Sequence, residues 1–326
     1  MLHSLIAIDG GGTKTAALLV DGNGNVQAEA LVSATNPNSL SEEVVQSRIE
    51  ALLTKLKVQA EHAYEEVRFV FAGMAGGDRE PAKTVFKEAI RHHFSVEPTI
   101  YVDHDAVTAL YSGTYGQPGI ASIAGTGSIV FGVNEYGDRD RLGGWGYLLE
   151  DAGSGFELGR QAVLHCMNEF DLKRVPSPLS EAVLAHFQVE RANELISLIY
   201  EPGKTRERIA PLSEQVCNLA VDGQPEAERI VREAAHKNAE AMVVMAERLF
   251  QHPPDQIVIA GSVYKSERLW RELLGDLFKE KLPDTTLTRP VYPVLAGAVA
   301  AADMNIGQTR TDEQYEKIFE QITIVS

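Results

Sequence analysis

Two glycine-rich turns are the part of this sequence with the clearest chemical use. The first is Gly10-Gly11-Gly12-Thr13-Lys14, after an apolar run at residues 5–8, and the second is Gly125-Thr126-Gly127-Ser128, after an apolar run at residues 119–124. Glycine lets backbone N–H groups approach phosphate oxygens without obstruction by a Cβ atom, and the threonine and serine hydroxyls add donors. Each turn could instead be an ordinary hairpin, but two of them, each after a buried strand, favour phosphate binding.

Asp9 stands between the first apolar run and the first glycine turn. A carboxylate at this strand end can hold Mg²⁺, directly or through water, against the phosphates of a nucleotide. Lys14, at the far side of the same turn, could add positive charge. The simpler alternative is an aspartate that caps the turn.

Asp105 is the candidate general base. The preceding strand is predicted to end at Val102, and residues 104–110 are typical of the opening of a helix. The helix dipole stabilises a carboxylate in the first turn as an anion. Near a sugar hydroxyl, this carboxylate could accept the proton while the oxygen attacks a γ-phosphoryl group. Asp105 could also be a plain helix-start charge, and Asp103 is the competing carboxylate.

A third glycine-rich segment, Gly143-Gly144-Trp145-Gly146, is suited to binding a sugar. Crowded glycines expose backbone donors, and Trp145 offers a flat apolar face, although it could instead fill a core position under a loop. Asp151, a few residues later, could accept hydrogen bonds from sugar hydroxyls. Asn36, in a polar loop after the third predicted strand, is suited to hydroxyl or amide recognition.

Other familiar signatures are absent from the sequence. Gly203-Lys204-Thr205 resembles the end of a P-loop, but Leu198 occupies the position of the required first glycine. No dinucleotide-binding glycine pattern follows the first strand, and there is no serine-hydrolase elbow or zinc-protease pair. The two cysteines, Cys166 and Cys217, are too few for a zinc cage and are expected to be buried thiols in a reducing, cytoplasmic compartment.

Composition limits the class of partner. The chain has 326 residues, of which 44% are hydrophobic and 23% charged, with a formal net charge of −16. Such a surface repels phosphate backbones and anionic lipid, so we expect no nucleic-acid and no membrane partner. The short N-terminal apolar run indicates a buried strand and not a signal peptide, and no stretch approaches a membrane span.

The order of predicted elements indicates an α/β protein of two domains. Strands and helices alternate up to about residue 116, with a helix at 42–56 and another at 81–92. The pattern of strand, glycine turn, strand and polar turn then recurs from residue 119, which indicates two related domains. Beyond residue 153 the chain is mostly helical, with long helices predicted at 225–251 and 266–281. The segment 116–119 is the best hinge candidate.

At these residues the chain resembles a known family. Residues 9–15 and 125–128 resemble the two phosphate motifs of the actin/hexokinase/Hsp70 superfamily, and Gly261-Ser262-Val263 resembles its adenosine motif. The chain also resembles the N-acetylglucosamine kinase family, which includes bacterial glucosamine and N-acetylmuramate kinases, in the order of its motifs: Asn36, Asp105, residues 125–128, residues 143–146, Asp151 and residues 261–266. The resemblance covers most of the chain, and the shared order of motifs is more specific than any one of them.

The resemblance implies two ribonuclease H-like lobes with nucleotide and sugar in a central cleft. It implies an N-terminal lobe at 1–117, a C-terminal lobe at 118–308 and a C-terminal helix at about 309–326 that returns to the first lobe. The implied reaction is ATP-dependent phosphorylation of the 6-hydroxyl of N-acetylglucosamine or N-acetylmuramate, with Mg²⁺ and with Asp105 as base. The protein would be a homodimer. The sugar site would contain Asn36, Gly143, Gly144, Trp145, Gly146 and Asp151, and the ATP site Gly11, Gly12, Thr13, Lys14, Gly125, Thr126, Gly127, Ser128, Gly261 and Ser262.

Three alternatives share this resemblance: a glucosamine kinase, a sugar or ATP sensor without turnover, and an ATPase that activates a radical dehydratase. Such activators hold a shared iron–sulfur cluster through cysteines near the glycine-rich loops. Cys166 and Cys217 do not occupy such positions.

Overall fold

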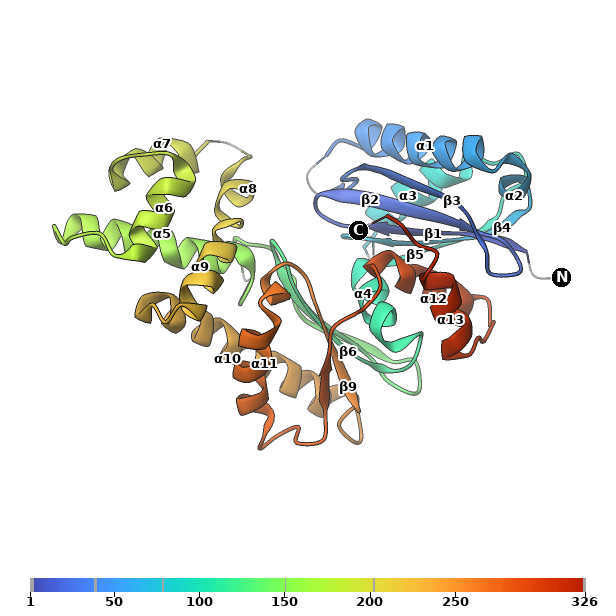
Figure 1. Ribbon diagram of the computed structural model, residues 1–326. Helices are drawn as coiled ribbons and strands as arrows, with labels where there is room; N and C mark the ends of the chain where they lie inside the picture. Colours follow the sequence, from blue (N-terminus) through green and yellow to red (C-terminus); the bar gives the residue numbers. More distant parts are fainter. Residues whose placement is uncertain (1–2, 38–39, 78, 150, 202, 325–326) are drawn as a thin grey trace. The chain divides into compact units, whose positions relative to one another are not determined.

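The chain folds into two compact units, each built on its own five-stranded sheet (Figure 1). The computed structural model describes residues 3–37, 40–77, 79–149, 151–201 and 203–324. Unit 1 comprises Met1–Pro118 and Arg289–Ser326, and unit 2 comprises Gly119–Thr288. The chain therefore returns to unit 1 at Arg289, so the segment 289–308, expected in the second lobe, belongs to the first.

The sheet of unit 1 has the strand order β3-β2-β1-β4-β5. The first three strands form an antiparallel meander, whereas β4 runs parallel to β1, and β5 runs parallel to β4. The strands are β1 (Ser4–Gly10), β2 (Lys14–Val20), β3 (Val26–Ser33), β4 (Val67–Met74) and β5 (Thr99–His104).

Helices cover both faces of this sheet, which explains the unbroken apolar run of β1. Side chains alternate along a strand, so Ile6 and Ile8 face one layer and Leu5 and Ala7 face the other. Ile6 and Ile8 join the buried cluster under α1 and α3, while α4 and α12 lie on the opposite side (Figure 1). The helices of unit 1 are α1 (Glu42–Gln59), α2 (Glu61–Glu65), α3 (Ala82–Arg91), α4 (Asp105–Thr114), α12 (Val294–Asn305) and α13 (Asp312–Phe319).

The C-terminal segment packs on the hairpin formed by β2 and β3. The helix α13 (Asp312–Phe319) is shorter than the helix expected at about 309–326, because Thr323 and Ile324 bond to the sheet instead. The backbone N–H groups of Thr323 and Ile324 donate to the Glu29 carboxylate at 2.7 and 3.1 Å. Phe319 also stacks on Tyr115, with ring centroids 5.6 Å apart.

The sheet of unit 2 repeats this topology, as the recurring sequence pattern predicted. Its order is β10-β9-β6-β7-β8, again an antiparallel meander of three strands followed by two parallel neighbours. The strands are β6 (Gly119–Ala124), β7 (Ser128–Val133), β8 (Arg139–Gly143), β9 (Gln256–Ala260) and β10 (Thr286–Thr288).

Unit 2 is completed by a helical layer on its sheet and a helical extension. The α-helices are α5 (Gly155–Asp171), α6 (Pro178–Phe187), α7 (Leu195–Ile199), α8 (Thr205–Ile209), α9 (Leu212–Val221), α10 (Pro225–Leu249) and α11 (Glu267–Phe278). In α10, Met242 and Met245 are fully buried, whereas Ala241 and Val244 are only partly buried. Within the described ranges, no helix has the length and apolarity needed to cross a bilayer.

A close approach between α12 and α4 gives a first prediction. A Cβ atom at Gly297 would lie 1.9 Å from the Thr108 carbonyl oxygen and 2.5 Å from the Ser112 backbone nitrogen, neither of which can rotate away. We expect Gly297→Ala to lower the free energy of unfolding by about 1–3 kcal/mol or more, measured by urea denaturation.

The matched control is Gly275→Ala in α11, where a Cβ atom would meet nothing within 4 Å. Alanine is a better helix former than glycine, so this variant should gain about 0.5–1 kcal/mol. Equal effects from the two substitutions would contradict the close contact at Gly297.

Candidate active site

Three strand ends bring two acidic side chains to one edge of the unit 1 sheet. The register aligns Asp9 of β1 with Gly73 of β4, and Gly73 with Asp103 of β5. These strands are parallel, so their carboxyl ends meet at the same edge, which is where ligands bind in open α/β sheets. Asp105, the predicted base, follows β5 directly and begins α4, as the sequence predicted.

The start of α4 is held by His104 and Thr108. His104 is the N-cap, with its Nδ1 atom accepting the backbone N–H of Ala106 at 3.0 Å, and the same Nδ1 atom lies 2.8 Å from Asp105 Oδ1. Thr108 Oγ1 lies 2.6 Å from both Asp9 Oδ1 and the Asp105 carbonyl oxygen. The Asp105 side chain keeps 29% of its surface exposed, so an outside hydroxyl group can reach it.

Asp9 is electrostatically unusual. Desolvation raises its pKa to about 7, against the hydrogen bond from Thr108, and the negative charge of Asp105 adds to the rise while Lys14 opposes it. A nearby cation would favour the ionised form of such a carboxyl.

The donor set at Asp9 fits Mg²⁺ bound mainly by water and phosphate. No group of three or more His, Cys, Asp or Glu side chains is arranged to hold a metal ion in the described part of the chain. Mg²⁺ does not need such a cage, because it keeps several waters and often binds through one or two carboxylates plus substrate phosphates. Asp9 is the residue that would hold it, and the ion would supply charge neutralisation on the phosphates.

The first glycine turn joins β1 to β2 and is open to solvent. It closes with a hydrogen bond from Gly11 N to the Lys14 carbonyl at 3.0 Å. A Cβ atom at Gly12 would meet nothing within 4 Å, and its φ lies outside the left-handed region. The fold of unit 1 therefore does not itself require glycine there, whereas close approach of a ligand to the backbone would.

Asn36 lies in the loop after β3. The two residues before it are hydrogen-bonded to residues of the first glycine turn and of β2. The backbone N–H of Ala34 donates to the Thr13 carbonyl at 3.1 Å, and the hydroxyls of Thr35 and Thr15 are 2.8 Å apart. These contacts fix the start of the loop. Residues 38 and 39 lie outside the described residues.

The second glycine turn, between β6 and β7, is tied to the start of α5. The N–H groups of Gly155 and Phe156 donate to the carbonyls of Gly125 and Thr126 at 2.7 and 3.2 Å. Ser128, expected to offer its hydroxyl to phosphate, donates it to the Ala152 carbonyl at 2.7 Å. As at Gly12, a Cβ atom at Gly125 would meet nothing within 4 Å.

Gly261 brings the third sequence motif against this second turn. A Cβ atom there would lie 2.4 Å from the Ala124 carbonyl oxygen, and its φ of +104° suits only glycine. Ser262 follows as the N-cap of the short 3₁₀ helix η2 (Val263–Lys265). The predicted phosphate and adenosine motifs of unit 2 are thus neighbours in space.

The segment Gly143–Gly146 has left-handed backbone at all three glycines, with φ of 73° at Gly143, 70° at Gly144 and 93° at Gly146. Trp145 is 56% exposed, so the alternative that it fills a core position is wrong. The Arg141 guanidinium carbon lies 4.5 Å from the centroid of the Trp145 ring. The ring is therefore displayed on the surface of unit 2.

Asp151 lies at the wall of a large cavity in unit 2. The cavity has a volume of about 1300 Å³ and is lined by residues of α5, α7 and α8 and by residues 147–149, 151 and 152. Most of its lining is apolar, with Tyr147, Phe156 and Ile196 among the contributors. The Asp151 carboxylate itself is only 4% exposed and lies 3.8 Å from Arg206 Nη2.

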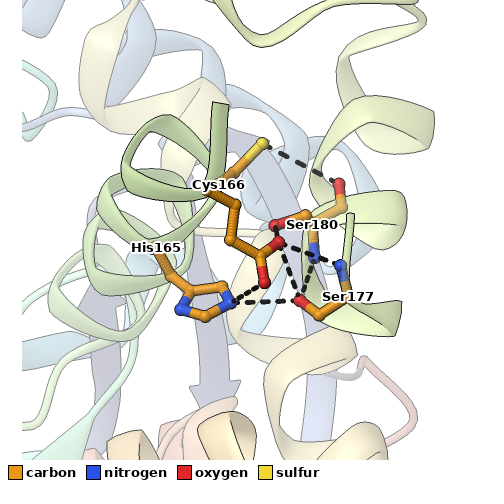
Figure 2. Close-up of polar contacts among 5 residues, drawn as sticks. His165, Cys166, Ser177 and Ser180 are labelled. Carbon is orange, nitrogen blue, oxygen red and sulfur yellow. Dashed lines mark hydrogen bonds and ion pairs between the residues drawn. The ribbon is translucent and has the colours of Figure 1, made fainter. Parts of the chain in front are cut away.

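A second polar cluster, outside the predicted site, joins α5 to the start of α6 (Figure 2). Glu169 Oε2 accepts from the Ser180 hydroxyl at 2.6 Å and from the Ser177 backbone N–H at 2.9 Å. His165 Nε2 lies 3.0 Å from Ser177 Oγ and 3.2 Å from Glu169 Oε1. In a serine-hydrolase triad the acid and the serine bind opposite ring nitrogens of the histidine, whereas here both lie at Nε2, so the cluster is not arranged as a triad. We call His165, Glu169, Ser177 and Ser180 the helix clamp, because their contacts join α5 to the start of α6.

The clamp gives a pH-dependent prediction. Burial opposes ionisation of Glu169, but the hydrogen bonds from Ser180 and Ser177, with His165, outweigh it and lower its pKa. The stabilisation is therefore present above the pKa of an unfolded glutamate and is lost as pH falls through the lowered value in the folded state. We expect Glu169→Gln to lower the free energy of unfolding at pH 7 by about 1–3 kcal/mol.

Urea denaturation between pH 7 and pH 3 should show the difference between wild type and variant shrinking toward acid pH. Glu233→Gln is the matched control, because Glu233 forms an exposed ion pair with Arg229 on α10, and the loss of such a pair should change the free energy of unfolding very little. A difference that stays constant with pH would contradict the role of the Glu169 charge.

Two site residues escaped the sequence analysis. Thr108 could have been found, because it lies one helical turn after Asp105 and so faces the same side of α4. Arg206 carried no signal of periodicity or glycine spacing. It lies beside the P-loop-like segment Gly203-Lys204-Thr205, whose described residues form a turn leading into α8.

The two sheets with their helices match the lobes of actin-like ATPases, as predicted. A crystal structure of a Chromobacterium violaceum protein assigned as an N-acetylglucosamine kinase superposes with a TM-score of 0.69, at 23% identity over 91% of this chain and 98% of that one. The model of the BadF/BadG/BcrA/BcrD ATPase family matches residues 6–304, and the chain belongs to that family.

Two relatives of known function are similar over most of their length. The N-acetylmuramic acid/N-acetylglucosamine kinase of Clostridium acetobutylicum is 31% identical over 260 residues, which are 79% of this chain and 85% of that enzyme. The N-acetyl-D-glucosamine kinase of Dictyostelium discoideum is 28% identical over 309 residues, 91% of this chain and 97% of that enzyme.

Proposed function

We propose that this protein transfers the γ-phosphoryl group of ATP to the 6-hydroxyl of an amino sugar, N-acetylglucosamine or N-acetylmuramate, with Mg²⁺ and as a homodimer. The observation that carries the proposal is Asp105, a partly exposed carboxylate fixed at the start of α4 beside the strand end that presents Asp9. The names of the two similar kinases supply the substrate class.

In this reaction Asp105 is the general base. Its carboxylate accepts the proton of the sugar hydroxyl as that oxygen attacks the phosphorus atom. The hydroxyl of Thr108, bonded to the Asp105 carbonyl, fixes the first turn of α4 and with it the Asp105 backbone. Asp103 is the alternative base, and its Oδ1 atom accepts the His104 backbone N–H at 2.8 Å.

Phosphate binding falls to the glycine turns. Gly11, Gly12, Thr13 and Lys14 of unit 1, and Gly125, Thr126 and Gly127 of unit 2, offer backbone N–H groups to the phosphates. Ser128 has a supporting role, since its hydroxyl is engaged by Ala152, and Gly261 and Ser262 lie beside the second turn as the adenosine site. Asp9 holds Mg²⁺, which neutralises charge on the phosphates.

Sugar recognition falls to the remaining predicted residues. The buried Asp151 carboxylate accepts hydroxyl hydrogen bonds, and the exposed Trp145 ring with its glycine neighbours Gly143, Gly144 and Gly146 offers an apolar face and backbone donors. Asn36 contributes from the loop after β3.

The role of dehydratase activator is less well supported for this chain. Cys166 and Cys217 are both buried in the core of unit 2, and burial raises the pKa of both thiols, that of Cys217 to about 11. Neither cysteine presents a thiolate at the surface with which to hold an iron–sulfur cluster.

A coupled assay of ADP release tests the function directly. Purified protein with Mg-ATP is offered glucosamine, N-acetylglucosamine, N-acetylmuramate, glucose and N-acetylgalactosamine in turn. Turnover with an N-acetylated sugar, and a 6-phosphate product by mass spectrometry, is the expected result. Binding of ATP without sugar-dependent ADP release would favour a sensor. A preference for glucosamine would contradict the proposed N-acetylated substrate and identify a glucosamine kinase.

Asp105→Asn tests the base. We expect kcat to fall by about 10²–10⁴-fold, because the amide cannot accept the hydroxyl proton, while sugar and ATP-analogue affinities stay near wild type. Steady-state kinetics and calorimetric titration measure the two effects separately. Asp103→Asn is the matched comparison, and a larger loss of kcat in that variant than in Asp105→Asn would transfer the role to Asp103.

A further inference from the structure

Arg206 places its guanidinium group over the second glycine turn, entirely within unit 2. A Cβ atom on Gly127 would lie 2.6 Å from Arg206 Nη2 and 3.1 Å from Asp151 Oδ2. The guanidinium carbon also lies 5.9 Å from the centroid of the Tyr147 ring. The absence of a side chain at Gly127 is therefore what allows a cation and a carboxylate to lie directly above the turn.

The contacts of Arg206 leave much of its binding capacity unused. A charge-assisted hydrogen bond between guanidinium and carboxylate is about 2.7–2.9 Å long, whereas the Arg206–Asp151 distance is 3.8 Å. The Nε atom is buried and has no hydrogen-bond partner in the part of the chain that the structure describes. The side chain as a whole remains 40% exposed, so an incoming group can reach it.

Arg208, two residues later in α8, shows the contrast. Its guanidinium donates to the Leu198 carbonyl and to the Glu201 carboxylate and ties α8 to the preceding segment. Two arginines of the same short helix are thus used differently. Arg208 joins α8 to the segment before it, whereas Arg206 places its N–H donors over the uncharged backbone of the second glycine turn.

We propose that Arg206 binds the terminal phosphoryl group of the nucleoside triphosphate held at the Gly125–Ser128 turn. The proposal rests on the proposed function and adds a charged residue to it. A planar guanidinium can donate to two phosphate oxygens at once. It would neutralise negative charge on the phosphate, which the uncharged backbone groups of the glycine turn cannot do. Asp151, close to Nη2, limits the directions in which the guanidinium can point.

Arg206 would act on the transferred group itself. In the transfer, the bond between the γ-phosphorus and the oxygen of the leaving ADP breaks, and the bond to the sugar oxygen forms. The hydroxyl proton goes to Asp105, and ADP leaves with the bridging oxygen. Arg206 stabilises the negative charge on the non-bridging oxygens during this exchange, as positioned cations do in other phosphoryl transfers.

Comparing a triphosphate analogue with a diphosphate tests the proposal without any sugar. Calorimetric titration of Mg-AMP-PNP and Mg-ADP into Arg206→Gln should show AMP-PNP affinity reduced about tenfold or more, with ADP affinity nearly unchanged, because only AMP-PNP carries the terminal group. Arg206→Lys keeps the charge but not the fork, and it should recover part of the loss. Arg229→Gln removes an exposed arginine of α10 and should leave both affinities unchanged.

Kinetics on the preferred sugar give the second readout. Arg206→Gln should lower kcat about 100-fold or more with little change in the sugar KM. Equal affinities of wild type and variant for AMP-PNP would overturn the proposal, and so would an equal loss for AMP-PNP and ADP. A rise in KM confined to N-acetylmuramate would also overturn it, because Arg206 would then bind the carboxylate of the sugar.

The outcomes separate this proposal from the proposed function. If the wild type phosphorylates no sugar but Arg206→Gln still loses AMP-PNP selectively, the Arg206 site stands and the kinase function fails. If Arg206→Gln does not fold, judged by circular dichroism and thermal unfolding, the comparison is made with Arg206→Lys, where a loss of AMP-PNP affinity smaller than that of ADP would count against the site.

Discussion

Unit 1 depends on how closely two helices approach each other on one face of its sheet. At Gly297, α12 has no side chain, and the Thr108 carbonyl of α4 occupies the space where one would begin. This contact presses α4 onto β1 and β4, which places the Thr108 hydroxyl against Asp9 and the first turn of α4 beside the strand ends. The position of the proposed base is thus set by a contact one helical turn away from it.

Much of the fold was predictable because short stretches of sequence show the hydrophobic patterns of the strands and helices that they form. Strands buried on both faces produce unbroken apolar runs, and β1 and β6 were found from such runs. The membership of α12 was not predictable, since a helix of small residues has no polar face to indicate which sheet it covers. In α10 the buried positions include Met242 and Met245, whose flexible side chains can fill irregular gaps in a core. The end of α13 depended on Glu29, far away in sequence.

The candidate site was predictable to the extent that its residues sit at strand ends and helix starts. The positions of Asp9 and Asp105 in their elements are as predicted, and their chemical roles remain proposals. The glycines divide in a way that sequence could not reveal. At Gly261 a side chain would clash with the backbone of Ala124, so the fold itself requires glycine there. At Gly12 and Gly125 a Cβ atom would meet nothing within 4 Å, so the fold leaves room for a side chain at both positions. Arg206 reaches the second turn from a segment about 80 residues later in the sequence, and only the folded structure brings them together.

The interruption of unit 1 by unit 2 has a consequence for synthesis on the ribosome. Unit 2 is a single continuous stretch, so all of its strands are available once Thr288 has left the exit tunnel. Unit 1 must wait, because α12, which covers one face of its sheet, is translated last but for the C-terminal segment. The nascent N-terminal sheet therefore has one face covered by α4 but not yet by α12 throughout the translation of unit 2, and the exposed apolar surface is a target for chaperones in that period.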